Sequence, residues 1–188
     1  RDLPGDLAKA ASVGADVAFT PGVTDMYPPG SQTFVTVGEV AAGLCGDLRP
    51  NHFRGVATVV CKLFNLVRPH VAIFGEKDYQ QLTLIRRMVR DLDLPVEIVG
   101  MPIVREADGL AMSSRNVYLS AEERMQSLAL VATLRESVAE VSKGEWNAAR
   151  ILESAQHRLH AQQDLKIDYV MICHAETLEE VETLDQQA

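Results

Sequence analysis

Apolar residues recur along the first hundred positions in two different periods, which predicts strands alternating with helices. Continuous apolar runs predict buried strands at 15–21 (ADVAFTP), 71–75 (VAIFG) and 96–100 (VEIVG), and 33–37 (TFVTV) is a further candidate strand. Helical spacing of apolar residues predicts helices at 6–13, 52–67 and 79–92. Strands and helices that alternate in this way are typical of a parallel sheet with crossover helices.

The two longer helices show which face each should bury. In the first, the apolar positions at helical spacing are Val56, Val59, Val60, Leu63 and Val67. In the second, they are Leu82, Ile85, Val89 and Leu92, and the opposite side carries Arg86, Arg87 and Arg90. Both helices are therefore expected to pack one apolar stripe against the sheet.

The pattern changes after position 103. A polar segment at 105–120 (READGLAMSSRNVYLS) is long for a plain connector, which suggests a functional role. Ser120 and Glu123 form a capping-box pattern that predicts a helix to about residue 142, followed by a helix at 147–162 and a strand at 166–173 (KIDYVMIC). We interpret residues 1–103 as an α/β unit and residues 104–188 as a smaller, helix-rich α+β domain.

Composition and charge narrow the class of protein. The chain has 188 residues, 47% of them hydrophobic and 23% charged, as in ordinary globular proteins. Its net charge of −8 argues against nucleic acid as a main partner, and most of the acidic excess falls after residue 115, so that a small polyanionic ligand fits the first part better. No apolar run approaches a membrane span and no signal peptide is recognisable, so we expect a cytoplasmic protein with reduced cysteines.

The turn after the strand at 71–75 carries the first candidate chemistry. Gly75 lets a backbone approach a ligand closely, Lys77 can neutralise phosphate oxygens, and Asp78 can accept hydrogen bonds from sugar hydroxyls. The helix that follows adds free N–H groups and a positive dipole end. The alternative is a solvated turn with an internal pair between Glu76 and Lys77.

A second candidate lies at 111–116 (AMSSRN). Two adjacent hydroxyls, Ser113 and Ser114, together with the planar fork of Arg115 can grip a triphosphate. The alternative is an ordinary loop at a helix entry. Gln81, one turn past Lys77, could aim its amide at an acceptor substrate or could simply lie on the surface.

Long stretches of this sequence resemble one enzyme family, the pantoate–β-alanine ligases (pantothenate synthetases). They are RPNHFRGVATVVCKLFNLVRP, FGEKDYQQLTLIRRMV and READGLAMSSRNVYLS, and the similarity continues from FTPGVTDMYP to IDYVMICHAETLE. The family belongs to the HIGH-type nucleotidyltransferases. The resemblance therefore implies a partial Rossmann-like domain at 1–103 and a smaller C-terminal domain at 104–188 that carries a phosphate-binding loop.

The resemblance also implies a reaction and a homodimer. Pantoate would attack the α-phosphate of Mg²⁺-bound ATP to give pantoyl adenylate, and the amine of β-alanine would then displace AMP. The ATP-binding residues implied are Gly75, Glu76, Lys77, Asp78, Val104 through its backbone, Met112, Ser113, Ser114 and Arg115. Lys77, Ser113, Ser114 and Arg115 would stabilise the reacting phosphates, and Gln81 would bind pantoate.

The sequence departs from the family pattern at both ends. The histidine-containing motif of the family's first strand, its early pantoate-binding glutamine and its last strands have no counterpart here, and the chain starts at Arg1. We therefore expect a fragment that is inactive by itself, and no general base for the amide step is evident. The alternatives are a nucleotidyltransferase of the same fold with another acceptor and a non-catalytic, dimerising fragment.

Overall fold

The structure is a computed structural model that describes residues 2–162 and 165–184. The chain divides into two compact units, Arg1–Phe34 and Val35–Ala188. The boundary expected between residues 103 and 104 stays a prediction.

The described residues of the first unit form two helices and no strand. Helix α1 spans Leu3–Ser12, where Asp2 caps the first turn by accepting a hydrogen bond from the N–H of Gly5, and α2 spans Val23–Met26. The strand predicted at 15–21 is wrong: this stretch is irregular, and Val17 and Phe19 are exposed. A strand needs a hydrogen-bonded neighbour, and within 2–162 and 165–184 no segment pairs with this stretch.

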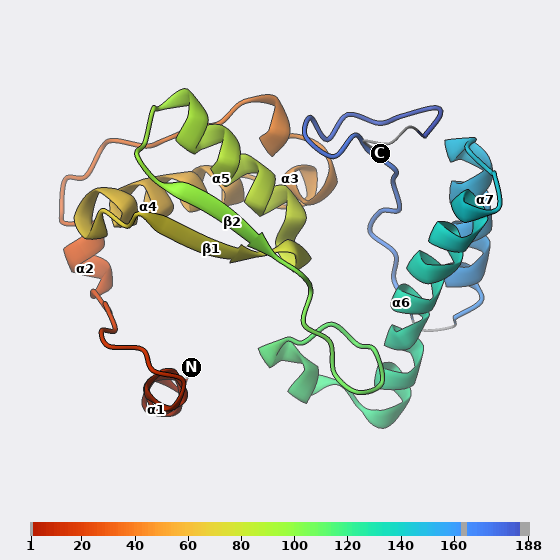
Figure 1. Ribbon diagram of the computed structural model, residues 1–188, viewed down its shortest axis with the longest axis horizontal. Coiled ribbons are helices and arrows are strands. Elements are labelled where there is room, and N and C mark those ends of the chain that lie inside the picture. Colours follow the sequence, from red (N-terminus) through yellow and green to blue (C-terminus); the bar gives the residue numbers. More distant parts are fainter. Residues whose placement is uncertain (1, 163–164, 185–188) are drawn as a thin grey trace. The chain divides into compact units, whose positions relative to one another are not determined.

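The second unit is built on a parallel pair of strands. Strand β1 (Val71–Gly75) pairs with β2 (Glu97–Met101), with Val71 opposite Glu97 and Gly75 opposite Met101. Between them the chain passes through a single 3₁₀ turn, η2 (Glu76–Asp78), and helix α5 (Tyr79–Asp91). Figure 1 shows the two arrows side by side, pointing the same way. The predicted strand–helix–strand unit is confirmed.

The two faces of β1 differ in how far they are covered by the described residues. Ala72 and Phe74 are half-buried, and Phe74 packs on the core, whereas Val71 and Ile73 are exposed. The prediction of a fully buried strand is therefore wrong for β1: its side chains alternate between a packed and an open face. The core on the packed face consists of Val40, Phe53, Ala57, Leu84, Ile85 and Met88.

Helices α4 and α5 supply most of that core. Helix α4 (His52–Val67) matches the predicted bounds. Its most buried residues are Phe53, Ala57 and Thr58, whereas Val67, which was expected on the packed face, is half-exposed. Phe53 and Ala57 are one turn apart, so the buried stripe runs through them rather than through Val59 and Leu63. In α5 the expected face is confirmed for Leu82 and Ile85, while Leu92 lies beyond the helix end and is exposed.

Further elements precede and follow this core in the sequence. The 3₁₀ turn η1 (Glu39–Ala41) and helix α3 (Leu44–Leu48) come first. After β2 come the 3₁₀ helix η3 (Ser114–Tyr118) and helices α6 (Ala121–Ser142) and α7 (Ala148–His160), which pack against each other. The capping box is confirmed: Ser120 Oγ accepts from the N–H of Glu123 at 3.1 Å, and Glu123 Oε2 accepts from the N–H of Ser120 at 2.7 Å.

Two further strand predictions are wrong. The segments 33–37 and 166–173 are irregular, apart from an isolated bridge between Cys173 and Glu180. At 33–37 the N–H of Val35 donates to a side chain, Thr58 Oγ1, rather than to a neighbouring strand. Apolar runs alone predicted these strands, but a strand forms only where a second chain segment offers its backbone.

Gln80 joins the core to the segment before α4. Its side chain is buried, its Nε2 donates to the carbonyl oxygens of Val40, Ala42 and Gly43 at 3.1–3.3 Å, and its Oε1 accepts from the N–H of Cys45 at 3.1 Å. These bonds satisfy backbone groups where the chain passes from η1 to α3. Gln80 therefore fixes residues 40–45 against the start of α5.

We expect Gln80→Met to lower the free energy of unfolding by about 2–4 kcal/mol, because it leaves several backbone groups without partners. Urea unfolding followed by circular dichroism measures this change. Gln81→Met is the matched control: Gln81 makes no hydrogen bond within the described part of the chain, so its effect should be far smaller. Equal effects of the two substitutions would contradict the role given to Gln80.

Candidate functional site

The turn at the carboxyl end of β1 exposes its charged groups. Lys77 and Asp78 are exposed and Glu76 is half-buried. Neither Glu76 nor any other described residue forms an ion pair with Lys77. The alternative of an internal Glu76–Lys77 pair thus loses its main interaction, and the ammonium group is available to an anion.

Gly75 leaves the backbone uncovered at this point. Its φ of −80° and ψ of 138° suit any residue, so the conformation does not require glycine. A Cβ built on Gly75 would meet no atom within 4 Å. Packing therefore does not require glycine either, and the missing side chain leaves room beside the backbone for another molecule.

The start of α5 adds polarity to the same turn. Asp78 precedes the 13-residue helix, and its side chain makes no capping bond, so its carboxylate does not satisfy the free N–H groups of the first turn. His52, at the start of α4, is close enough to this turn to interact electrostatically with Asp78. Burial of the imidazole and then the charge of Arg49 lower the pKa of His52, while the charge of Asp78 raises it. The imidazole is therefore held toward its neutral form.

The polar segment after β2 is a hairpin rather than an open loop. The N–H of Met112 donates to the carbonyl of Val104 at 2.9 Å, and that of Glu106 donates to the carbonyl of Leu110 at 2.8 Å. An antiparallel bridge joins Arg105 to Ala111. Gly109 closes the turn at a φ of +98°, a conformation that favours glycine. The segment is thus structured by its own backbone.

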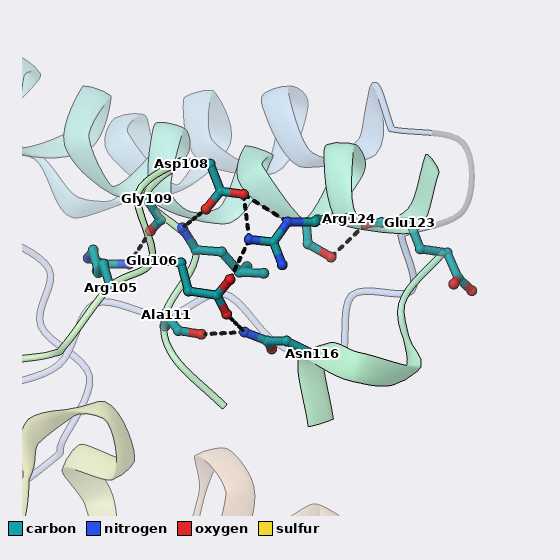
Figure 2. Close-up of polar contacts among 10 residues, drawn as sticks. Arg105, Glu106, Asp108, Gly109, Ala111, Asn116, Glu123 and Arg124 are labelled. Carbon is teal, nitrogen blue, oxygen red and sulfur yellow. Dashed lines mark hydrogen bonds and ion pairs between the residues drawn. The ribbon is translucent and has the colours of Figure 1, made fainter. Parts of the chain in front are cut away.

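Four side chains, Glu106, Asp108, Asn116 and Arg124, hold this hairpin against α6, and we call them the Arg124 cluster (Figure 2). Arg124 Nη2 lies 2.6 Å from both Glu106 Oε2 and Asp108 Oδ2, and its Nε donates to Asp108 Oδ2 at 2.8 Å. Asn116 Nδ2 donates to Glu106 Oε1 at 2.6 Å and to the carbonyl of Ala111 at 3.1 Å. A planar guanidinium that binds two carboxylates gives a well-defined geometry.

The hydrogen bonds of this cluster shift its titration. The bond from Asn116, and then that from Arg124, lowers the pKa of Glu106. The N–H of Leu110, followed by Arg124, lowers the pKa of Asp108. The two carboxylates in turn raise the pKa of Arg124. All three groups are therefore charged at neutral pH, and the hairpin is held by charge-assisted bonds.

The cluster leaves the proposed phosphate-binding residues outside it. Ser113 Oγ accepts from the N–H of Arg115 at 3.2 Å, which begins η3. Ser114 and Arg115 are exposed, and in residues 2–162 and 165–184 their side chains form no hydrogen bond or ion pair. Because Asn116 follows directly and belongs to the cluster, these hydroxyls and the guanidinium project from a fixed base.

The structure brings some of the predicted residues together and leaves others separate. Val104 and Met112 share a backbone hydrogen bond. Lys77 makes no contact of this kind with Ser113, Ser114 or Arg115 among the described residues, so their convergence on one ligand stays a prediction. Gln81 is half-buried beside the fully bonded Gln80, and its amide remains available.

Sequence reasoning missed Gln80 and most of the Arg124 cluster. The signal for the cluster was present: two acidic residues at positions 106 and 108 share one side of an extended segment, and Arg124 lies in the first turn of the next helix.

The three cysteines are free thiols, as expected. The described residues contain no group of three or more metal-ligating side chains, and none of the described helices has the length and apolar character of a membrane span.

The fold is that of an α/β protein whose candidate site residues lie on loops that follow two parallel strands. Comparison with known proteins agrees: the sequence profile of the family described as pantoate-beta-alanine ligase matches residues 1–188. The pantothenate synthetases of Syntrophotalea carbinolica and Syntrophobacter fumaroxidans are 53% and 55% identical over 98% of this chain. The chain spans 65% of the length of each of these relatives.

Solved structures give the same result. The crystal structure of pantothenate synthetase from Thermus thermophilus superposes with a TM-score of 0.94 at 48% identity, covering 98% of this chain and 67% of that one. The ligase from Francisella tularensis, complexed with beta-gamma ATP and beta-alanine, has a TM-score of 0.66 at 31% identity, covering 84% of this chain and 59% of that one. The chain belongs to the pantoate–β-alanine ligase family, and its Rossmann-like fold class is confirmed.

We expect Arg124→Gln to destabilise the hairpin in a pH-dependent way. The folded-state pKa values of Glu106 and Asp108 are lowered from the ordinary 4.5 and 3.8, so the stability they contribute is present above those values and is lost as the pH falls through the lower folded-state values. The difference in unfolding free energy between wild type and variant should therefore be largest near pH 7 and shrink below about pH 4.5.

Urea unfolding at a series of pH values measures that difference. Lys143→Gln, at the other end of α6, is the matched control, because Lys143 forms no ion pair with a described residue. A gap between wild type and Arg124→Gln that stayed constant from pH 7 to pH 3 would show that the carboxylates do not act through Arg124.

Proposed function

We propose that this chain is part of an ATP-dependent ligase that condenses pantoate and β-alanine to pantothenate through a pantoyl-adenylate intermediate. The observation that carries this proposal is the turn after β1, which offers an uncovered backbone at Gly75 and, beside a helix start, a cation at Lys77 that no described residue pairs with. Ligands of open parallel sheets bind at this edge. Family membership then supplies the substrate class.

In the first step a carboxylate oxygen of pantoate attacks the α-phosphorus of ATP, and the bond to the bridging oxygen of pyrophosphate breaks. Lys77 would stabilise the negative charge on the phosphate oxygens, while Gly75 and Asp78 would hold the ribose. Gln81 would orient pantoate through its side-chain amide. Because the attacking carboxylate is already ionised, this step needs no general base.

The hairpin after β2 would supply the second set of phosphate contacts. Ser113, Ser114 and Arg115 would bind the departing pyrophosphate, and the backbone of Val104 with the side chain of Met112 would border adenine. Preorganised donors of this kind stabilise developing charge without reorganising during the reaction. The Arg124 cluster supports this role because it fixes the base from which the three side chains project.

Magnesium would arrive with the nucleotide. Mg²⁺ is commonly bound through substrate phosphates and one or two carboxylates rather than in a protein cage. In the second step the neutral amine of β-alanine attacks the acyl carbon of the adenylate, the acyl–oxygen bond breaks with its electron pair staying on AMP, and the new amide nitrogen loses a proton to solvent.

Two alternative functions remain to be tested against this proposal. A nucleotidyltransferase with another acceptor would bind ATP without any effect of pantoate, and a non-catalytic dimerising fragment would bind neither. Calorimetry with pantoate and with pantothenate separates them. A cytoplasmic location and a homodimer also stay predictions, based on the family resemblance and on composition.

Lys77→Ala is the direct test of the proposed chemistry. In a protein of the relatives' full length that carries this segment, we expect pantoate-dependent ATP–pyrophosphate exchange to fall about 100- to 1,000-fold, because a charged donor to the transition state is lost. Lys143→Ala should leave exchange unchanged. A normal rate in Lys77→Ala with an intact fold would remove Lys77 from the mechanism.

We also expect the 188-residue chain by itself to show no pantoate-dependent exchange. The reason is that its sequence contains no counterpart of the histidine-containing phosphate-binding motif that the resemblance implies. Incubation with ATP, pantoate and labelled pyrophosphate measures this directly, with a full-length relative as the positive control. Detectable label in ATP would contradict the expectation.

A further inference from the structure

Gly100 lies at a point where two opposite charges meet. It pairs in the sheet with Phe74, which stands two residues before the first residue of η2. A Cβ built on Gly100 would lie 2.9 Å from Arg86 Nη2 and 3.3 Å from Glu76 Oε1. The guanidinium from α5 and the carboxylate from η2 therefore flank the same small space beside β2.

Neither charge has another partner in the described part of the chain. Arg86 and Glu76 take part in no hydrogen bond or ion pair with a described residue, whereas the next arginine on the helix, Arg87, is bound to Asp91 at 2.7 Å. Arg86 lies on the exposed side of α5 but reaches back toward the sheet edge, past Leu82. The two groups are not in direct ion-pair contact, but opposite charges on either side of one small space attract each other, and half-burial of Glu76 reduces screening of its carboxylate by solvent.

No described side chain caps the turn itself. No side chain caps the start of η2, and the Asp78 side chain makes no capping bond to α5. Of the three charged side chains in η2, Lys77 and Asp78 are exposed, so Glu76 is the one that points toward the packed part of the molecule. An interaction that fixes Glu76 thus fixes the backbone from which the other two project.

We propose that Arg86 is a positioning residue, whose guanidinium draws the Glu76 carboxylate across Gly100 and thereby holds the turn Glu76–Asp78 with Lys77 directed away from the sheet. Glycine at position 100 leaves room for this arrangement, because a Cβ there would meet Arg86 Nη2 at 2.9 Å, Leu82 Cδ2 at 3.0 Å and Glu76 Oε1 at 3.3 Å. The consequence for nucleotide binding rests on the function proposed above, whereas the effect on the turn does not.

The test uses this chain without any ligand. Backbone order parameters from ¹⁵N relaxation report how rigid residues 76–78 are. We expect values near about 0.85 in the wild type to fall below about 0.6 in Arg86→Gln. Gly100→Ala should act in the same direction, because a methyl group there meets the flexible end of Arg86 at 2.9 Å, and also Leu82 Cδ2 at 3.0 Å, so that the guanidinium is displaced while its charge remains.

Two matched variants control for charge and for the loss of glycine. Arg90→Gln removes a neighbouring arginine whose contact with Asp91 is long, at 3.8 Å, and Gly55→Ala adds a methyl group in α4 where no atom lies within 4 Å. Both should leave the order parameters of the turn at wild-type values. Exchanging the charges in the double variant Glu76→Arg with Arg86→Glu should restore most of the order that Arg86→Glu alone removes.

Unchanged order parameters in both Arg86→Gln and Gly100→Ala, or no recovery in the charge-exchanged double variant, would overturn the proposal. Calorimetry with ATP then tests the functional consequence: if wild type binds, Arg86→Gln should weaken binding about fivefold, as for an interaction of modest strength. Absence of ATP binding in wild type would count against the proposed function and leave the result for the turn standing.

Discussion

The parallel pairing of β1 with β2 is the constraint on which the site depends. With Gly75 opposite Met101, both strands end at the same edge, so the turn after β1 and the segment that leads into the hairpin start from neighbouring positions. Parallel strands require a crossover, and α5 is that crossover. The same helix therefore buries Leu84 and Ile85 in the core, anchors the preceding segment through Gln80 and begins directly behind the candidate phosphate-binding turn.

The charges of this region fall into two groups with different tasks. Those in the Arg124 cluster neutralise one another through short hydrogen bonds, which stabilises the hairpin that follows β2. Lys77 and Arg115 have no such partners among the described residues. This separation fits the proposed binding of a triphosphate, because a cation already paired within the protein would have to break that pair before it could bind phosphate.

The sequence predicted the elements that depend on local signals. The bounds of α4, the capping box at Ser120 and the strand–helix–strand unit follow from periodicity and caps, which act within a few residues. The strands at 15–21 and 166–173 failed because apolar composition does not show whether a second segment offers hydrogen bonds. Gln80 was missed because its partners lie 35–40 residues away in the sequence and meet it only in the fold. The Arg124 cluster joins residues 16–18 positions apart, and its charge pattern was a signal that periodicity and caps do not use.

The family resemblance located the candidate residues, but the structure adds a reason for their neighbours. Gly75 pairs with Met101, and Gly100 pairs with Phe74 one position earlier in the sheet. The space beside Gly75 is open, whereas the space beside Gly100 is bordered by Arg86, Leu82 and Glu76. A glycine that leaves an empty space suits a ligand, and a glycine that admits two protein charges suits a positioning interaction. One edge of the sheet thus combines an open surface, the candidate binding surface, with the turn that Arg86 is proposed to hold.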